Sequence, residues 1–138
     1  MPPWSKLEFA NDGKNLLLGT LGSHHYVIDS FKGSLVTRLV RDRGPTITKH
    51  GVGAGFGGIA TTSGDVCWAP DGRYVIGGSG EKGVCVWDVG KGEPVEGCLR
   101  PMKELEYPKD GATCVAFNPR NSLFATARKE VVCFSPLR

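Results

Sequence analysis

The chain has 138 residues, of which 40% are hydrophobic and 22% are charged, and these proportions exclude an intrinsically disordered chain. Its 17 basic and 14 acidic residues leave a net charge of +3, which by itself does not indicate nucleic-acid binding, because such binding needs several clustered phosphate contacts. No apolar run approaches the roughly 20 residues of a membrane-spanning helix, so no membrane partner is expected. The 20 glycines and 9 prolines predict many turns between short strands.

Residues 4–33 and 63–92 are two copies of one pattern. They align without a gap at a constant offset of 59, and eight positions are identical. A third copy, 113–136, aligns Phe117 with Trp68 at an offset of 49 and is two residues shorter before its last apolar segment. Repetition of this kind is typical of architectures in which each repeat is one supersecondary unit.

Each copy predicts three strands, and the second copy shows them most clearly. VCWA (66–69) ends in a Pro-Asp-Gly turn, YVIGGS (74–79) follows, and VCVWD (84–88) comes third. A fourth strand, over 34–40 in the first copy and 93–99 in the second, completes a four-stranded antiparallel sheet. The strands are almost continuously apolar, so both faces of each sheet must be covered, as in the stacked blades of a propeller.

Glycines 53, 55 and 58 spell the G-x-G-x-x-G of a dinucleotide-binding turn. That site also needs a helix directly after the glycines, whose N-terminus meets the pyrophosphate. The β-branched and turn residues that follow predict no helix, so we interpret 41–62 as a glycine-rich loop between blades and expect no cofactor.

Two further candidate sites have simpler interpretations. His24 and His25 are adjacent on an expected strand and point to opposite faces, so they do not form a metal site. Five cysteines without a C-x-x-C pair indicate reduced packing thiols rather than a disulfide framework or a zinc site. No organised catalytic set is found, and we expect no enzyme, no catalytic residue and no metal.

The segment GGSGEKGVCVWD (77–88) resembles the core pattern of the WD-repeat (WD40) family. In that family a Trp, a Ser or Thr, a turn Asp and a loop His form a hydrogen-bonded set within a blade. Trp87 and Ser79 match this pattern, while Glu81 stands at the turn Asp and no His precedes the first strand convincingly. The resemblance therefore implies an incomplete set and a larger share of apolar packing.

Aspartates recur at the expected turns of the first two copies. We expect them to cap turns through their own backbone, a structural role. They are Asp12, Asp29, Asp71 and Asp88.

A basic stretch, 40–50, lies at the start of the glycine-rich loop. It carries four candidate partner-binding residues, with one acidic residue opposing them: Arg41, Arg43, Lys49 and His50. Such a stretch contacts RNA or an acidic peptide, or is simply a solvated loop.

The segments LEFANDGK and IDSFKG are more specific than a general WD repeat. They resemble the C-terminal part of the WD-repeat subunits shared by COMPASS-type histone lysine methyltransferase complexes and the cleavage and polyadenylation factor. The resemblance implies an all-β fold, a partial propeller of about three four-stranded blades within residues 1–138. A blade at 4–40, the loop 41–62, a blade at 63–99 and an incomplete blade at 112–136, lacking its outer strand, are expected.

The function implied by this resemblance is that of a non-catalytic scaffold in the nucleus. Its partners would be protein subunits of a chromatin-modifying complex and of the messenger-RNA 3′-end machinery. A general WD-repeat adaptor in another complex and an RNA-contacting module remain alternatives. Because three repeats cannot close a ring, we also expect a truncated product that is completed by missing N-terminal blades or by self-association.

Overall fold

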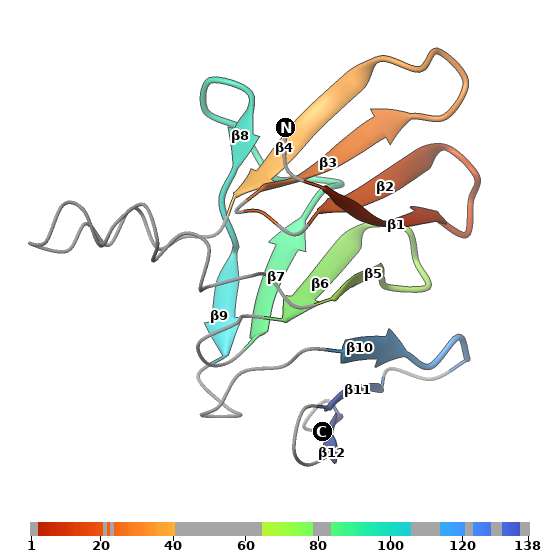
Figure 1. Ribbon diagram of the computed structural model, residues 1–138, viewed down its shortest axis with the longest axis vertical. Helices are drawn as coiled ribbons and strands as arrows, with labels where there is room; N and C mark the ends of the chain where they lie inside the picture. Colours follow the sequence, from red (N-terminus) through yellow and green to blue (C-terminus); the bar gives the residue numbers. More distant parts are fainter. Residues whose placement is uncertain are drawn as a thin grey trace, which may run out of the picture.

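The computed structural model describes residues 3–20, 22, 24–40, 65–78, 84–105, 114–120, 123–127 and 131–135. These residues form twelve β-strands in three sheets, which lie one above another in Figure 1. No helix occurs in this part of the chain.

The first sheet contains the first four strands in consecutive antiparallel order. They are β1 (Trp4–Phe9), β2 (Asn15–Thr20), β3 (His24–Asp29) and β4 (Leu35–Val40). A short fifth strand, β8 (Cys98–Leu99), pairs with β4 in parallel orientation.

The second sheet lies below the first and has four antiparallel strands. In spatial order they are β5 (Val66–Trp68), β6 (Tyr74–Gly78), β7 (Val84–Asp88) and β9 (Lys103–Leu105).

The third sheet lies below the second in Figure 1. It is an antiparallel meander of β10 (Cys114–Phe117), β11 (Phe124–Ala127) and β12 (Val131–Phe134).

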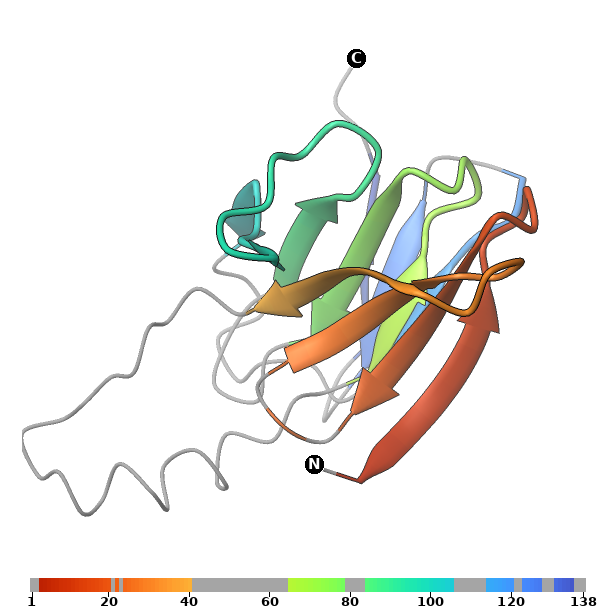
Figure 2. The ribbon, with the colours of Figure 1, turned by 90° about the horizontal axis from the view of Figure 1, so that it is seen from above.

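The expected fourth strand over 93–99 is wrong, because β9 takes that place in the second sheet. Residues 93–102, which we call the strap, leave the second sheet, pass beside β4 and return as β9 (Figures 1 and 2). A two-residue turn at Glu96 and Gly97, both with positive φ (54° and 77°), reverses the chain between Val95 and Cys98. The strap follows this course because Leu99 is then buried between the first and second sheets.

The principal core fills the space between the first and second sheets. The first sheet contributes Leu17, Val27 and Leu39, and the second contributes Val66, Trp68, Val75, Cys85 and Trp87. Full burial of each large apolar side chain stabilises the fold by about 1.5–3 kcal/mol. Gly77 is required beneath Trp87, because a Cβ atom there would lie 2.8 Å from the indole ring.

Two cysteines, Cys67 and Cys85, are buried as free thiols. Cys67 belongs to the smaller core between the second and third sheets, and its burial raises the pKa of the thiol to about 12. The thiolate is therefore disfavoured, and Cys67 acts as a small apolar residue.

One face of the first sheet carries exposed apolar side chains. Glu8 is directed to the second sheet, where it binds Trp68, so its neighbours Leu7 and Phe9 lie on the opposite face. In the repeat these two positions correspond to Val66 and Trp68, which are buried in the principal core. The exposed face is thus the one that, in the second sheet, is covered by a neighbouring sheet.

Candidate interaction site

Hydrogen bonds from two tryptophans join the first and second sheets. The Trp68 backbone N–H donates to Glu8 Oε1 at 3.0 Å, and its indole N–H donates to the Glu8 carbonyl at 3.1 Å. The Trp87 indole N–H donates to the carbonyl of Val40 at 3.0 Å. The ring of His25 meets the Trp87 ring edge to face, with centroids 6.0 Å apart. These contacts fix the two sheets against each other.

The structure gives Trp87 a partner in the neighbouring sheet. The expected partners within its own blade, Ser79 and Glu81, lie outside the described residues. The interaction that is described, with Val40, ties the third strand of one blade to the fourth strand of the preceding one. Sequence reasoning did not find this partner, because Val40 lies 47 residues away.

The two histidines lie on β3 in different environments. His25 is fully buried, and its Nδ1 accepts a hydrogen bond from the backbone N–H of Thr20 at 3.1 Å. Burial, with a smaller contribution from Arg38, lowers the pKa of His24. Within the described residues no group of three His, Cys, Asp or Glu side chains is arranged to hold a metal ion.

The turn aspartates accept backbone hydrogen bonds. Asp12 accepts from the N–H of Lys14, and Asp29 accepts from the N–H groups of Phe31 and Lys32. The two backbone bonds lower the pKa of Asp29. These carboxylates stabilise local chain reversals and touch no other functional group in the described contacts.

The corresponding aspartates of the second sheet do the same. Asp71 accepts from the N–H of Arg73, and Asp88 accepts from the N–H of Lys91. Asp88 also binds the Arg73 guanidinium through both carboxylate oxygens, at 2.9 and 2.8 Å. This bidentate pair joins the start of β6 to the end of β7.

The Arg73 pair makes stability depend on pH. Hydrogen bonding from Arg73 lowers the pKa of Asp88 to about 2, assisted by the Lys91 N–H and opposed by partial desolvation. Because the folded pKa is below the ordinary value of 3.8, ionised Asp88 stabilises the fold above about pH 4, and this contribution is lost as the pH falls through about 2. When the pH is lowered from about 5 to about 2.5, we expect the thermal midpoint of unfolding to fall by less in Asp88→Asn than in the unsubstituted chain.

Differential scanning calorimetry at both pH values measures this effect. Glu93→Gln neutralises an exposed carboxyl group on the strap and serves as the control. Equal pH responses in Asp88→Asn and Glu93→Gln would contradict the assignment.

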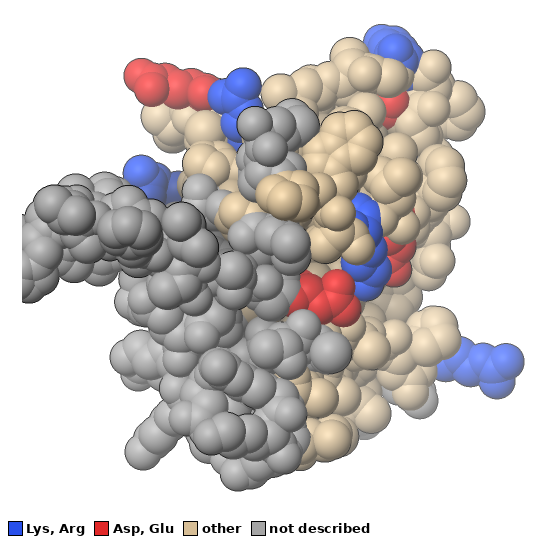
Figure 3. Space-filling model, in the orientation of Figure 1, with Lys and Arg blue, Asp and Glu red and all other residues tan. Residues whose placement is uncertain are grey.

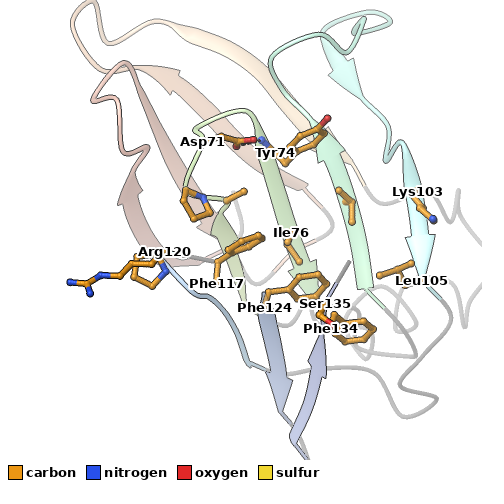
Figure 4. Close-up of a pocket in the computed structure, with 14 residues that line it drawn as sticks. Asp71, Tyr74, Ile76, Lys103, Leu105, Phe117, Arg120, Phe124, Phe134 and Ser135 are labelled. Carbon is orange, nitrogen blue, oxygen red and sulfur yellow. Dashed lines mark hydrogen bonds between the residues drawn. The ribbon is translucent and has the colours of Figure 1, made fainter. Parts of the chain in front are cut away.

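An apolar groove separates the second and third sheets. Its volume is about 880 Å³. The floor on the second sheet includes Ile76 and Val86, and Leu105 of β9 closes one side. Figure 4 shows Phe117, Phe124 and Phe134 of the third sheet around this space, with Arg120 and Lys103 directed outward at opposite sides.

The phenylalanines form one row across the third sheet. Phe124 pairs with Phe117 on one side and with Phe134 on the other. The ring centroids are 5.7 Å apart in the first pair and 4.7 Å apart in the second, and both pairs are stacked. The row therefore presents a continuous aromatic wall to the second sheet.

The repeat explains why the groove lies at this place. In the second copy the positions of Phe117, Phe124 and Phe134 are taken by Trp68, Val75 and Trp87. Those residues fill the principal core, whereas the phenylalanine row leaves an open volume. The groove was not predicted from sequence, although three phenylalanines at these repeat positions were the available signal.

Charged side chains are dispersed on the described surface. Figure 3 shows basic and acidic groups interspersed on one face, without a broad area of either sign among the residues described. The basic candidates Arg41, Arg43, Lys49 and His50 and the glycine-rich loop 41–62 lie outside the described residues. Within the described part of the chain, no helix has the length and apolar character needed to cross a membrane.

Comparison with known proteins identifies the repeat and the fold. Residues 59–88 match the WD40 model, described as WD domain, G-beta repeat. The crystal structure of the Cps50 (Swd1) β-propeller domain of Myceliophteria thermophila superimposes with a TM-score of 0.67 over 97% of this chain and 38% of that chain, at 16% sequence identity. The expected all-β, partial-propeller fold is confirmed.

Two of the curated relatives that match nearly the whole chain are 30% identical to it. An uncharacterized WD repeat-containing protein of Schizosaccharomyces pombe is 30% identical over 99% of this chain. The COMPASS component SWD2 of Saccharomyces cerevisiae is 30% identical over 93% of it. The chain spans 38% and 36% of the length of these relatives, respectively.

Proposed function

We propose that this chain, which carries a WD40 repeat and folds as part of a β-propeller, contributes a protein-binding platform to a histone methyltransferase complex of the COMPASS type. The observation that carries the proposal is the similarity to COMPASS component SWD2 over 93% of the chain. A second relative, the Set1 complex component swd2 of Schizosaccharomyces pombe, is 30% identical over 64% of the chain.

Binding is the mode of action that suits this platform. The first two sheets are joined by tryptophan hydrogen bonds and a shared core, so they hold their turns and edges in fixed positions. The groove beside them offers apolar volume to a partner segment. We propose a non-catalytic role with protein subunits as partners and, from the names of the relatives, chromatin in the nucleus as the site of action.

The proposal extends to the machinery that cleaves and polyadenylates messenger RNA. This extension depends on the LEFANDGK and IDSFKG segments, which resemble WD-repeat subunits shared by the two assemblies. The same binding platform would serve both assemblies.

Affinity purification tests the proposal. The full chain, tagged and expressed in Saccharomyces cerevisiae, should enrich the methyltransferase subunits of COMPASS, measured by quantitative mass spectrometry against a tagged WD-repeat fragment of unrelated origin. Enrichment of cleavage and polyadenylation subunits tests the second assembly. Enrichment equal to that of the unrelated fragment, or selective enrichment of a different complex, would contradict the proposed role.

A further inference from the structure

The strap shows how this chain fills the space between two of its sheets. β8 lies beside β4, and Leu99 enters the principal core. The carbonyl of Gly97 accepts hydrogen bonds from the Arg38 N–H at 3.0 Å and from the Thr37 hydroxyl at 3.3 Å. A short segment that contains the Glu96–Gly97 turn and one aliphatic anchor, Leu99, therefore occupies the outer end of the first inter-sheet space.

Gly92 makes room for this anchor. A Cβ atom at position 92 would lie 2.6 Å from Leu99 Cδ1 and 2.3 Å from the carbonyl oxygen of Asp88. The close approach shows that the strap is packed tightly where it enters the core.

The space between the second and third sheets is bordered by strands in the same register as the space between the first and second sheets, but different side chains lie in it. In the first sheet, Thr37 and Leu39 of β4 pair with Val27 and His25. In the second sheet, Lys103 and Leu105 of β9 pair with Val86 and Val84, which are the residues at the corresponding repeat positions. Lys103 and Leu105 therefore take the places of Thr37 and Leu39. The groove runs from β9 to the turn that carries Arg120. Within the described residues it holds no side chain that corresponds to Leu99, and about 880 Å³ remains open.

The charges at the groove favour an acidic occupant. Lys103 and Arg120 lie at its two sides, and the single carboxylate in the lining, Asp71, already accepts the backbone N–H of Arg73. Residues 93–99 of the strap, EPVEGCL, have the complementary composition, with two glutamates and the aliphatic residues Val95 and Leu99, and Arg100 follows them. The stretch that ends in the buried anchor Leu99 is thus acidic, and both of its glutamates are exposed.

We propose that the groove between the second and third sheets binds an acidic segment of a partner protein, which inserts an aliphatic side chain against Ile76, Val86 and the phenylalanine row as Leu99 is inserted in the first space. This inference rests on the proposed function, because it names where and by what chemistry a partner subunit docks. Lys103 and Arg120 pair with the acidic side chains of the segment, and the groove buries the anchor.

A strap peptide is the probe. Fluorescein-labelled EPVEGSL, residues 93–99 of the strap with the cysteine as serine, is titrated with the full chain and followed by fluorescence anisotropy. We expect saturable binding with a Kd below about 100 μM. A peptide with serine in place of leucine and glutamine in place of both glutamates should bind at least about tenfold more weakly.

Variants of the chain locate the binding. Lys103→Glu reverses an exposed charge on the outermost strand of the second sheet and should weaken binding about fivefold or more, whereas Lys14→Glu, the same change in an exposed turn of the first sheet, should not. Val86→Phe adds volume inside the groove and should abolish binding with the fold retained by circular dichroism. If Val86→Phe unfolds, the comparison of Lys103→Glu with Lys14→Glu alone decides whether the peptide binds in the groove.

The outcomes distinguish a failure of the groove proposal from a failure of the proposed function. Equal affinities for Lys103→Glu and Lys14→Glu, or failure of unlabelled peptide to displace the probe, would overturn the partner segment as the occupant of the groove. Co-purification of COMPASS subunits that is unchanged by Lys103→Glu would leave the function intact and reject the groove. Failure of the unsubstituted chain to co-purify them would reject the function, whatever the peptide does.

Discussion

Trp87→Ala is expected to lower the free energy of unfolding by about 3–5 kcal/mol, the usual cost of removing a buried aromatic side chain. Trp87 has 0% exposure and lies at the centre of the principal core. Its substitution leaves a cavity beside Gly77, which packs against the indole ring and has no side chain to fill the space. It also removes the hydrogen bond to the carbonyl of Val40.

Trp87→Phe separates these two contributions. Most of the apolar volume remains, while the indole N–H is lost, so the cost should be about 1–2 kcal/mol. Phe31→Ala, at a side chain that is 83% exposed, is the control and should change stability by less than about 0.5 kcal/mol. Urea unfolding, followed by far-ultraviolet circular dichroism rather than by tryptophan fluorescence, measures the free energy of unfolding of all three variants. A cost for Trp87→Ala as small as that for Phe31→Ala would show that the two sheets do not depend on this contact.

The strands of the repeats were predictable because their determinants are local. Alternation of side-chain direction sets the sheet faces, and Asp-Gly turns such as Asp12-Gly13 and Asp71-Gly72 reverse the chain. Gly13 and Gly72 both have positive φ, at 75° and 73°, a conformation that glycine adopts at little cost. Two such reversals at the same offset are visible in one sequence without knowledge of any distant contact.

The course of the strap was not predictable, because distant contacts determine it. Leu99 is buried against the first sheet, and Gly97 binds Thr37, which lies 60 residues earlier. The apolar pattern of 93–99 is equally compatible with pairing to β7, so composition alone does not distinguish the two arrangements. The tertiary contact decides between them.

The groove illustrates a different limit of sequence reasoning. The repeat places Phe134 at the position of Trp87, but the consequence of this difference depends on how two sheets pack. A phenylalanine lacks the second ring and the N–H that tie Trp87 to the preceding sheet. The repeat therefore predicts where an inter-sheet space occurs, while the volume left in it follows from the side chains of both faces.

The strap provides the second large expected effect. Leu99→Ala should lower the free energy of unfolding by about 2–4 kcal/mol, because Leu99 is 4% exposed and belongs to the principal core. Val95→Ala, four residues earlier on the same strap and 69% exposed, should cost less than about 0.5 kcal/mol. Amide hydrogen exchange is the second measurement, since release of the strap exposes the Arg38 N–H that donates to Gly97.

Faster exchange at Arg38 in Leu99→Ala and not in Val95→Ala would show that one aliphatic anchor holds the strap between two sheets of this chain. Loss of stability without faster exchange at Arg38 would show instead that Leu99 supports the core while the backbone pairing of β8 with β4 holds the strap. The first result gives the physical reason why the groove beside β9, which has the same frame and no anchor among its described residues, accepts a segment of the same kind.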